Sequence, residues 1–148
     1  MKIDISGVEQ PIVRSSSKAW QIGLWAAQIV LSILFVMPGA MKAFMTPEAM
    51  ATAGIASAPD IPLWLLRFIG VSEIAGAVGM ILPAATRILP FLTPLAALGF
   101  VTIQVLAIGF HAIRGETSHT IAFNLVYLAL SLFVLWGRTK KLPIEPRS

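Results

Sequence analysis

Polar side chains inside long apolar stretches are the residues of this sequence that could do chemistry. Glu73 and Arg67 lie within the apolar run 63–82, and Gln104 lies within the run 88–111. A charged group in hydrocarbon costs at least a few kcal/mol on most scales, so such a residue is a candidate functional group. A carboxyl group there can exchange a proton, pair with a cation or hold the polar head of a ligand.

Glu73 is the strongest of these candidates, and its partner cannot be Arg67 on the same helix. Six helical residues turn the chain by roughly 600°, which leaves the two side chains about 120° apart. Glu73 therefore either finds a partner on another helix or carries a proton.

The other candidates lie in or beside the remaining apolar runs. Gln28 lies in the middle of the first run, Asn124 and Tyr127 share a helix face, and Lys42 and His111 lie at outer ends. We predict a polar-lined cavity, open outward or laterally and floored by Glu73. Its candidate ligand-binding residues are Gln28, Lys42, Arg67, Glu73, Gln104, His111, Asn124 and Tyr127. The candidates for catalysis are Glu73, His111 and Tyr127.

Ordinary structural roles could account for most of these residues. The depth of Arg67 permits its side chain to reach the interface, where Lys42 and His111 also lie. The three amides could be hydrogen-bonding contacts between helices. Packing alone explains Glu73 least well, because a carboxyl group in mid-membrane has no obvious neighbour in the sequence.

The composition shows which elements must position these groups. Apolar residues make up 57% of the 148 residues and charged residues 12%, against typical values of ~45–50% and ~25%. The mean hydropathy is +0.83. A chain with so few polar residues cannot cover a water-exposed surface, which excludes a soluble enzyme, a disordered protein and a nucleic-acid-binding domain.

Four apolar runs approach or exceed the ~20 residues that a helix needs to cross a bilayer. They predict helices at about 20–41, 63–82, 88–111 and 120–136, with Pro83 ending the second. The predicted fold is an all-α integral membrane four-helix bundle over 20–137. The flanking segments are an N-terminal tail (1–19) and a basic C-terminal tail (138–148).

The basic residues predict the orientation of this bundle. Four spans place both tails and the second connection on one side, which holds eight Lys and Arg residues, whereas the other side holds two. The positive-inside rule then makes both termini cytoplasmic.

Several chemistries find no support in the sequence. There are no cysteines, which excludes disulfides and thiolate metal sites. No phosphate-binding loop or dinucleotide-binding fold is recognisable. We therefore expect no metal and find no cofactor evident, although a bound quinone or lipid fits the predicted cavity.

The chain resembles the DoxX-like family of small four-helix membrane proteins over about residues 20–136. The resemblance rests on the order and spacing of several motifs, of which RFIGVSEIAG at 67–76 is the strongest. The others are PGAMK at 38–42, PEA at 47–49, LTPLAA at 92–97, FHAIRGE at 110–116 and Asn124. It implies a location in the bacterial inner membrane and, for some members, a link to quinone-dependent oxidoreductase systems. It assigns a catalytic role to no residue.

Three functions remain open from the sequence. The leading one is a ligand-binding or accessory subunit linked to quinone or lipid redox, for which Glu73→Gln is expected to change ligand retention while folding stays intact. The second is a cofactor-independent enzyme that uses Glu73 as general acid/base on an apolar substrate, and the third is a membrane assembly factor or scaffold. The expected partners are the lipid bilayer, an apolar small molecule and either membrane oxidoreductase subunits or further copies of the chain, but no nucleic acid.

Overall fold

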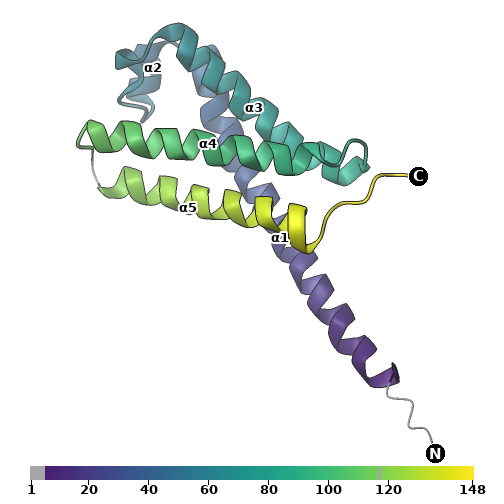
Figure 1. The fold of residues 1–148 in the computed structure, drawn as a ribbon. Coiled ribbons are helices and arrows are strands. Elements are labelled where there is room, and N and C mark those ends of the chain that lie inside the picture. The colour runs from purple at the N-terminus through teal and green to yellow at the C-terminus, as the bar shows by residue number, and fades with distance from the viewer. Residues whose placement is uncertain (1–5, 117) are drawn as a thin grey trace, which may run out of the picture.

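The computed structural model describes residues 6–116 and 118–148, with side-chain surroundings for 17–116 and 120–148. Within these residues the chain forms helices and no strand (Figure 1). The helices are α1 (Ser6–Phe44), α2 (Pro47–Thr52), α3 (Leu63–Thr86), α4 (Leu92–Ile113) and α5 (Ser118–Trp136), with a 3₁₀ turn η1 (Ala58–Asp60) and a π-helical turn η2 (Gly137–Lys141).

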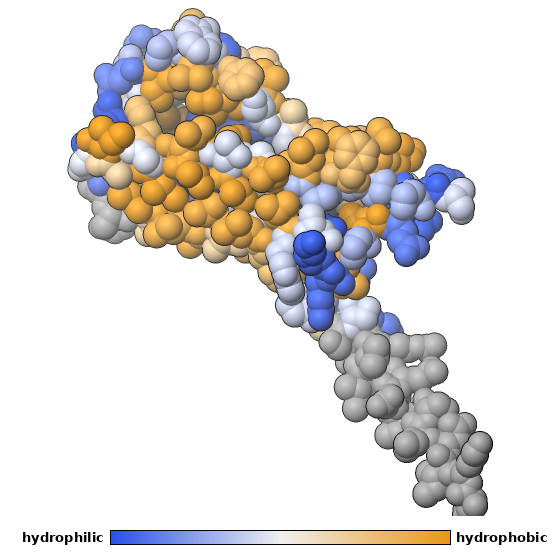
Figure 2. Space-filling view, viewed as in Figure 1, coloured by the Kyte–Doolittle hydropathy of each residue, from blue (hydrophilic) through white to orange (hydrophobic). Residues whose placement is uncertain are grey.

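The predicted all-α four-helix bundle is confirmed. In the described part of the chain, four helices are long and apolar enough to cross a membrane: α1 from Ser17, α3, α4 and α5 with η2. Large apolar side chains remain exposed on all of them, and apolar residues cover most of the face seen in Figure 2. Such a surface suits contact with lipid rather than water.

The helix boundaries differ from the predicted spans in ways that have physical causes. α1 begins at Ser6 rather than at residue 20, and its first turns project beyond the bundle (Figure 1). The apolar run marks where hydrocarbon begins, whereas a helix can continue into water because its backbone bonds are internal. The predicted N-terminal tail is therefore helical from Ser6.

Pro83 does not end α3, which continues to Thr86. A proline removes one backbone N–H but does not prevent the next residues from staying helical. The helix stops where Arg87 adopts a left-handed conformation (φ 59°), and Leu89 follows with φ 48°. This tight connection delays the start of α4 from the predicted residue 88 to Leu92.

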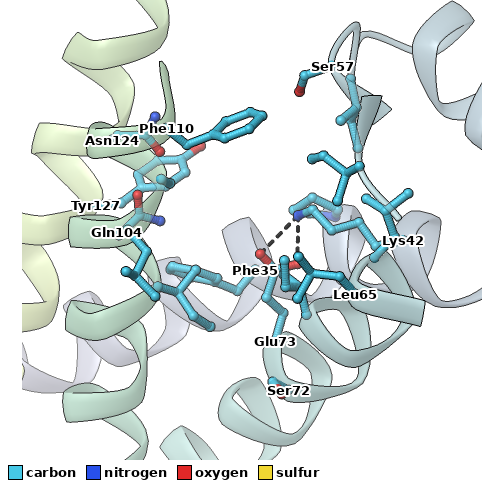
Figure 3. Close-up of a pocket in the computed structure, with 18 of the residues that line it drawn as sticks. Phe35, Lys42, Ser57, Leu65, Ser72, Glu73, Gln104, Phe110, Asn124 and Tyr127 are labelled. Carbon is cyan, nitrogen blue, oxygen red and sulfur yellow. Dashed lines mark hydrogen bonds and ion pairs between the residues drawn. The ribbon is translucent and has the colours of Figure 1, made fainter. Parts of the chain in front are cut away.

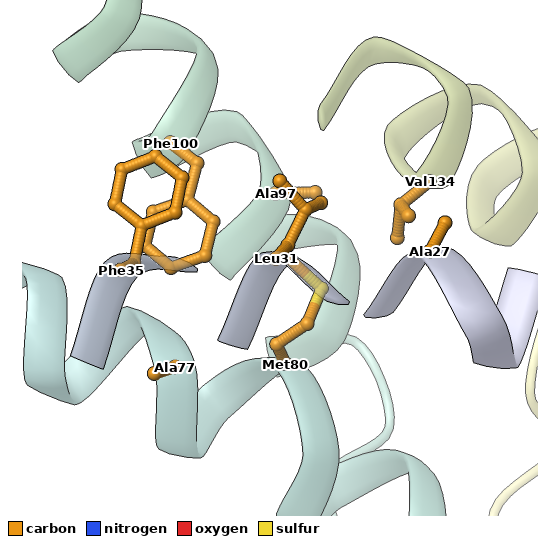
Figure 4. Packing of buried hydrophobic residues seen from close by; sticks show 8 residues of the cluster. All are labelled: Ala27, Leu31, Phe35, Ala77, Met80, Ala97, Phe100 and Val134. Atoms are coloured by element: carbon orange, nitrogen blue, oxygen red, sulfur yellow. The ribbon is translucent and has the colours of Figure 1, made fainter. Parts of the chain in front are cut away.

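The main core lies toward the connection 87–91, since its α3 residues come from the second half of that helix and its α4 residues from the first half. Figure 4 shows this packing. Its centre is a stacked pair of rings, Phe35 of α1 and Phe100 of α4, with centroids 3.7 Å apart. The complete buried cluster is Ala27, Leu31, Phe35, Ala77, Met80, Ala97, Phe100 and Val134.

The first connection (residues 45–62) is folded rather than extended. Thr46 caps α2 by accepting a hydrogen bond from the Ala49 N–H. Met50 and Ala58 are fully buried and form a second cluster with Leu66 of α3. The first connection is therefore attached to the bundle by its own small core.

Candidate functional site

A cavity of about 670 Å³ occupies the half of the bundle that the main core leaves unfilled. Its walls come from α1, α3, α4, α5 and the first connection, and Phe35 separates it from the core. Most of the lining is apolar. The polar lining residues are Lys42, Ser57, Ser72, Glu73, Thr102, Gln104, His111, Asn124 and Tyr127.

Glu73 has its partner on another helix, one of the two outcomes left open by the sequence. Lys42 Nζ of α1 donates to both carboxylate oxygens, at 2.9 Å and 2.8 Å. The side chains are 17% and 5% exposed, respectively. The pair therefore forms one charged wall of the cavity.

Close packing of α1 against α3 brings this pair together. A Cβ atom at Gly70 would lie 2.6 Å from both Gly39 O and Ala43 N, so only glycine fits at this crossing. Gly39 is almost as tight, since its Cβ would lie 3.0 Å from Glu73 Cβ. Small residues at helix crossings allow this approach in membranes.

Gln104, Asn124 and Tyr127 face the Lys42–Glu73 pair across the cavity (Figure 3). Gln104 is 4% exposed, and its Oε1 has no hydrogen-bond partner among the described residues. Asn124 Nδ2 donates to Thr120 O of its own helix at 2.9 Å. This second wall therefore offers uncharged polar groups, one of which is a buried acceptor without a donor.

His111 also lines the cavity and belongs to an ion-pair network at the end of the cavity nearest the first connection. Its Nδ1–H donates to Glu116 Oε2 at 2.6 Å, and Arg114 Nε donates to Glu116 Oε1 at 2.6 Å. Arg114 Nη2 also donates to Asp60 Oδ2 of η1 at 2.7 Å. We call these four residues the Arg114 network; it joins the first connection to the end of α4.

Hydrogen bonds within the Arg114 network shift the pKa values of Glu116 and Arg114. The hydrogen bond from Arg114, followed by that from His111, lowers the pKa of Glu116. The hydrogen bonds to Glu116 and Asp60 raise the pKa of Arg114. The Glu116 carboxylate and the Arg114 guanidinium are therefore held in their charged forms at neutral pH.

Two predicted ligand-binding residues do not line the cavity. Arg67 Nη1 donates to Lys42 O at 2.7 Å and to Met45 O at 2.8 Å. These carbonyls lie at the C-terminal end of α1, where helical partners are missing and a cation is favourable. Arg67 therefore joins α3 to the end of α1 instead of lining the predicted mouth.

Gln28 lies at the opposite end of the bundle. Its Nε2 donates to Met80 O at 2.7 Å, and its Oε1 accepts from Arg138 Nε at 2.8 Å. Arg138 is 3% exposed and its guanidinium lies 5.8 Å from the centre of the Trp25 ring. The predicted basic tail therefore begins with a buried residue, because η2 continues α5 and turns Arg138 inward.

Sequence reasoning missed Arg138, the first connection as a wall and the Arg114 network. Arg138 resembled other basic residues of a tail, and no sequence signal distinguishes it. The first connection did carry a signal, since Met50, Ile55 and Ile61 are apolar residues in a proline-rich loop. In the described part of the chain, no cluster of three or more His, Asp or Glu residues is placed to hold a metal ion.

The fold and the cavity define a small four-helix membrane protein with a partly polar internal site. The family model described as the DoxX-like family matches residues 26–134. The chain therefore belongs to the DoxX-like family. The match includes α3 and α4 in full, α1 from residue 26, α5 up to residue 134 and every cavity-lining residue, but ends before Arg138. No curated protein and no solved structure matches the chain.

Proposed function

We propose that this DoxX-like protein binds a small, mostly apolar molecule with a polar head, of the quinone or lipid type. It would act as a ligand-binding or accessory subunit of a membrane redox system. The volume of about 670 Å³ lies within the range of ~300–1,000 Å³ typical of small-molecule sites. The mostly apolar lining, with a few converging polar groups, is also typical of such sites.

The observation that carries the proposal is the unpartnered Gln104 Oε1. A buried acceptor without a donor costs about 1–3 kcal/mol, so a bundle with only a structural role gains nothing from it. A hydroxyl group on a bound head would supply the donor. Lys42 and Tyr127, on the two walls, could donate to a carbonyl oxygen, so the cavity suits both a quinone and its quinol.

Gln104→Leu tests this proposal by removing the amide and keeping a similar shape. Gently extracted wild type and variant would be compared by native mass spectrometry and by absorbance of their organic extracts. We expect the wild type to carry a defined small molecule that the variant retains at least five-fold less. The melting temperature should stay equal or rise, because a buried unsatisfied group has been removed.

Thr93→Val is the matched control. Thr93 is also on α4 and also has a buried, unpartnered oxygen among the described residues, but it lies outside the cavity lining. It should retain the molecule fully. Equal retention in Gln104→Leu and the wild type would contradict the proposal, and so would a large loss of stability in Gln104→Leu, which would show a structural role.

An enzyme remains a second candidate because Glu73, His111 and Tyr127 all line the same cavity. Glu73 would then have to exchange a proton while paired with Lys42. Incubation of purified protein with epoxides, sterols and terpenes would test for turnover. The scaffold hypothesis gains no such support. Gly76 and Gly79 are small residues at which a partner helix could pack closely, but both already pack against α4 of the same chain.

We further propose that the protein lies in the bacterial inner membrane with cytoplasmic termini. The end of the bundle with both termini carries Arg87, Arg138 and the basic residues of η2, which supports this orientation through the positive-inside rule. Membrane oxidoreductase subunits or further copies of the chain are the partners that fit an accessory role.

A further inference from the structure

We infer that the ligand reaches the cavity from within the bilayer, through a lateral portal between α3 and α4, and that its hydrocarbon tail stays in that portal. This inference rests on the proposed function. It narrows the ligand to an amphipathic, membrane-dissolved molecule, with a polar head inside the bundle and an apolar chain in the lipid.

The exposure of the lining residues locates the opening. Phe68 of α3 and Leu106 of α4 line the cavity and are 66% and 68% exposed, and Thr102 of α4 is exposed as well. All other lining residues are buried or half-buried. We call Phe68, Thr102 and Leu106 the portal residues. The cavity therefore opens where α3 and α4 face each other.

The packing of α3 against α4 explains this gap. Near the connection 87–91 the helices touch closely, with Gly76 against the Phe100 ring and Gly79 against Ala96. From there they diverge toward the opposite end (Figure 1). The space-filling view shows apolar side chains on both sides of the resulting hollow (Figure 2).

The depth of the portal places it in hydrocarbon rather than in water. Phe68 is five residues from the start of α3 and Leu106 is seven from the end of α4. At 1.5 Å per residue these positions lie roughly 8 Å and 10 Å inside spanning helices. A molecule that passes between them must already be dissolved in the membrane.

In contrast to the portal, the end of the cavity nearest the first connection is closed. The first connection covers it, with Ser57 6% exposed and Ala58 fully buried. The Arg114–Asp60 ion pair fastens η1 to the end of α4. The polar groups inside and the large apolar side chains of Phe68 and Leu106 at the portal thus match the two parts of one amphipathic ligand.

A reversible cross-link across the portal tests the inference. The chain contains no cysteine, so Phe68→Cys/Leu106→Cys introduces the only two thiols. The variant, in phosphatidylcholine vesicles with ubiquinone-10 as the probe, would be closed with bis-methanethiosulfonate linkers of graded length and reopened with reductant. Release of bound ubiquinone-10 into quinone-free vesicles would be followed by extraction and absorbance.

The matched control is Val78→Cys/Leu95→Cys, which places a linker between exposed positions of the same two helices on the packed half. We expect the portal cross-link, verified by its mass, to slow release at least ten-fold and the reductant to restore the rate. The control cross-link should have no effect. An unchanged rate in the closed portal, with binding intact, would overturn the lateral route alone. Absence of ubiquinone-10 binding in the uncross-linked wild type would instead contradict the proposed function for quinones, and the inference with it.

Discussion

In the Lys42–Glu73 pair, the cost of removing two charges from water opposes the attraction between them. Each charge loses water when it is buried, and the attraction between them recovers this cost only while both are present. A merely stabilising contact could be replaced by apolar side chains with equal or better effect. The presence of the Lys42–Glu73 ion pair on the wall of the cavity therefore favours a role in holding a polar ligand head.

Lys42→Gln should destabilise the fold by about 3–5 kcal/mol, because it leaves the Glu73 carboxylate buried without its partner. Glu73→Gln should also cost stability, which departs from the sequence-based expectation of intact folding. The double variant should be more stable than the sum of the two losses implies. Unfolding in mixed micelles would measure all four proteins, and strictly additive losses would show that the charges do not interact.

The cavity-lining residues could be predicted from the sequence where depth along a spanning helix alone determines the position of the side chain. Glu73, Gln104, Asn124 and Tyr127 were expected around one cavity, and all four line it. Depth does not tell how far a long side chain reaches. Lys42 extends inward to the carboxylate, whereas Arg67 turns to backbone carbonyls, and no residue spacing distinguishes these two outcomes.

The crossing of α1 and α3 is the element contact on which the site depends. It positions Lys42 opposite Glu73, and it exists because Gly39 and Gly70 let the backbones meet. Glycines such as Gly70 and Gly76 in the second spanning helix indicate close helix packing from the sequence alone. The sequence does not indicate which helix packs there, because the periodicity of the residues identifies the packed face of a helix but not the neighbouring helix that it contacts.

Gly70→Ala should destabilise the protein by about 1–3 kcal/mol, because the new methyl group would meet backbone atoms of α1 that cannot move independently. The displacement should also weaken ligand retention by separating Lys42 from Glu73. Thermal unfolding and native mass spectrometry would measure the two effects.

Gly99→Ala is the matched control, since a Cβ atom on this helical glycine meets nothing within 4 Å. It should be neutral or stabilising by up to about 1 kcal/mol through helix propensity. If both variants lose the same stability, the crossing is not the tight contact described above.

The membrane-spanning segments could be predicted within a few residues because hydrocarbon thickness sets the length of an apolar run. The ends could not, because they depend on local contacts that hydropathy ignores. α3 passes Pro83 and ends at the left-handed Arg87, and α5 continues into η2 because Arg138 finds Gln28. The first outcome is set by local backbone conformation, whereas the second needs a tertiary partner that lies far away in the sequence.

Considered as a whole, the molecule has one filled half and one hollow half, with the first connection fastened over the hollow half by the Arg114 network. The lowered pKa of Glu116 sets the pH range in which the Arg114 network stabilises the folded protein. A carboxyl group with a lower pKa in the folded than in the unfolded protein stabilises above its unfolded value of about 4.3. That contribution is lost as the pH falls through the folded value.

Arg114→Gln should therefore lower the melting temperature slightly, by about 2 °C, at pH 7. The difference from wild type should shrink as the pH falls below the unfolded value of about 4.3 and through the lowered pKa of Glu116 in the folded wild type. Melting curves at several pH values would show it. Arg87→Gln, an exposed arginine at the other end, should show no such pH dependence, and a constant difference for Arg114→Gln would contradict the role of Glu116.

Ligand binding in the hollow half would also make the stability of the bundle depend on the ligand concentration. Side chains around an empty volume lack the dispersion contacts that a filled core provides. A ligand that binds only the folded bundle restores such contacts and adds about 2.7 kcal/mol when present at one hundred times its dissociation constant. Because detergent extraction dilutes a membrane-dissolved ligand, the proposed function predicts that the purified bundle is less stable than the bundle in the bilayer. Returning the ligand to the detergent should therefore reverse the loss.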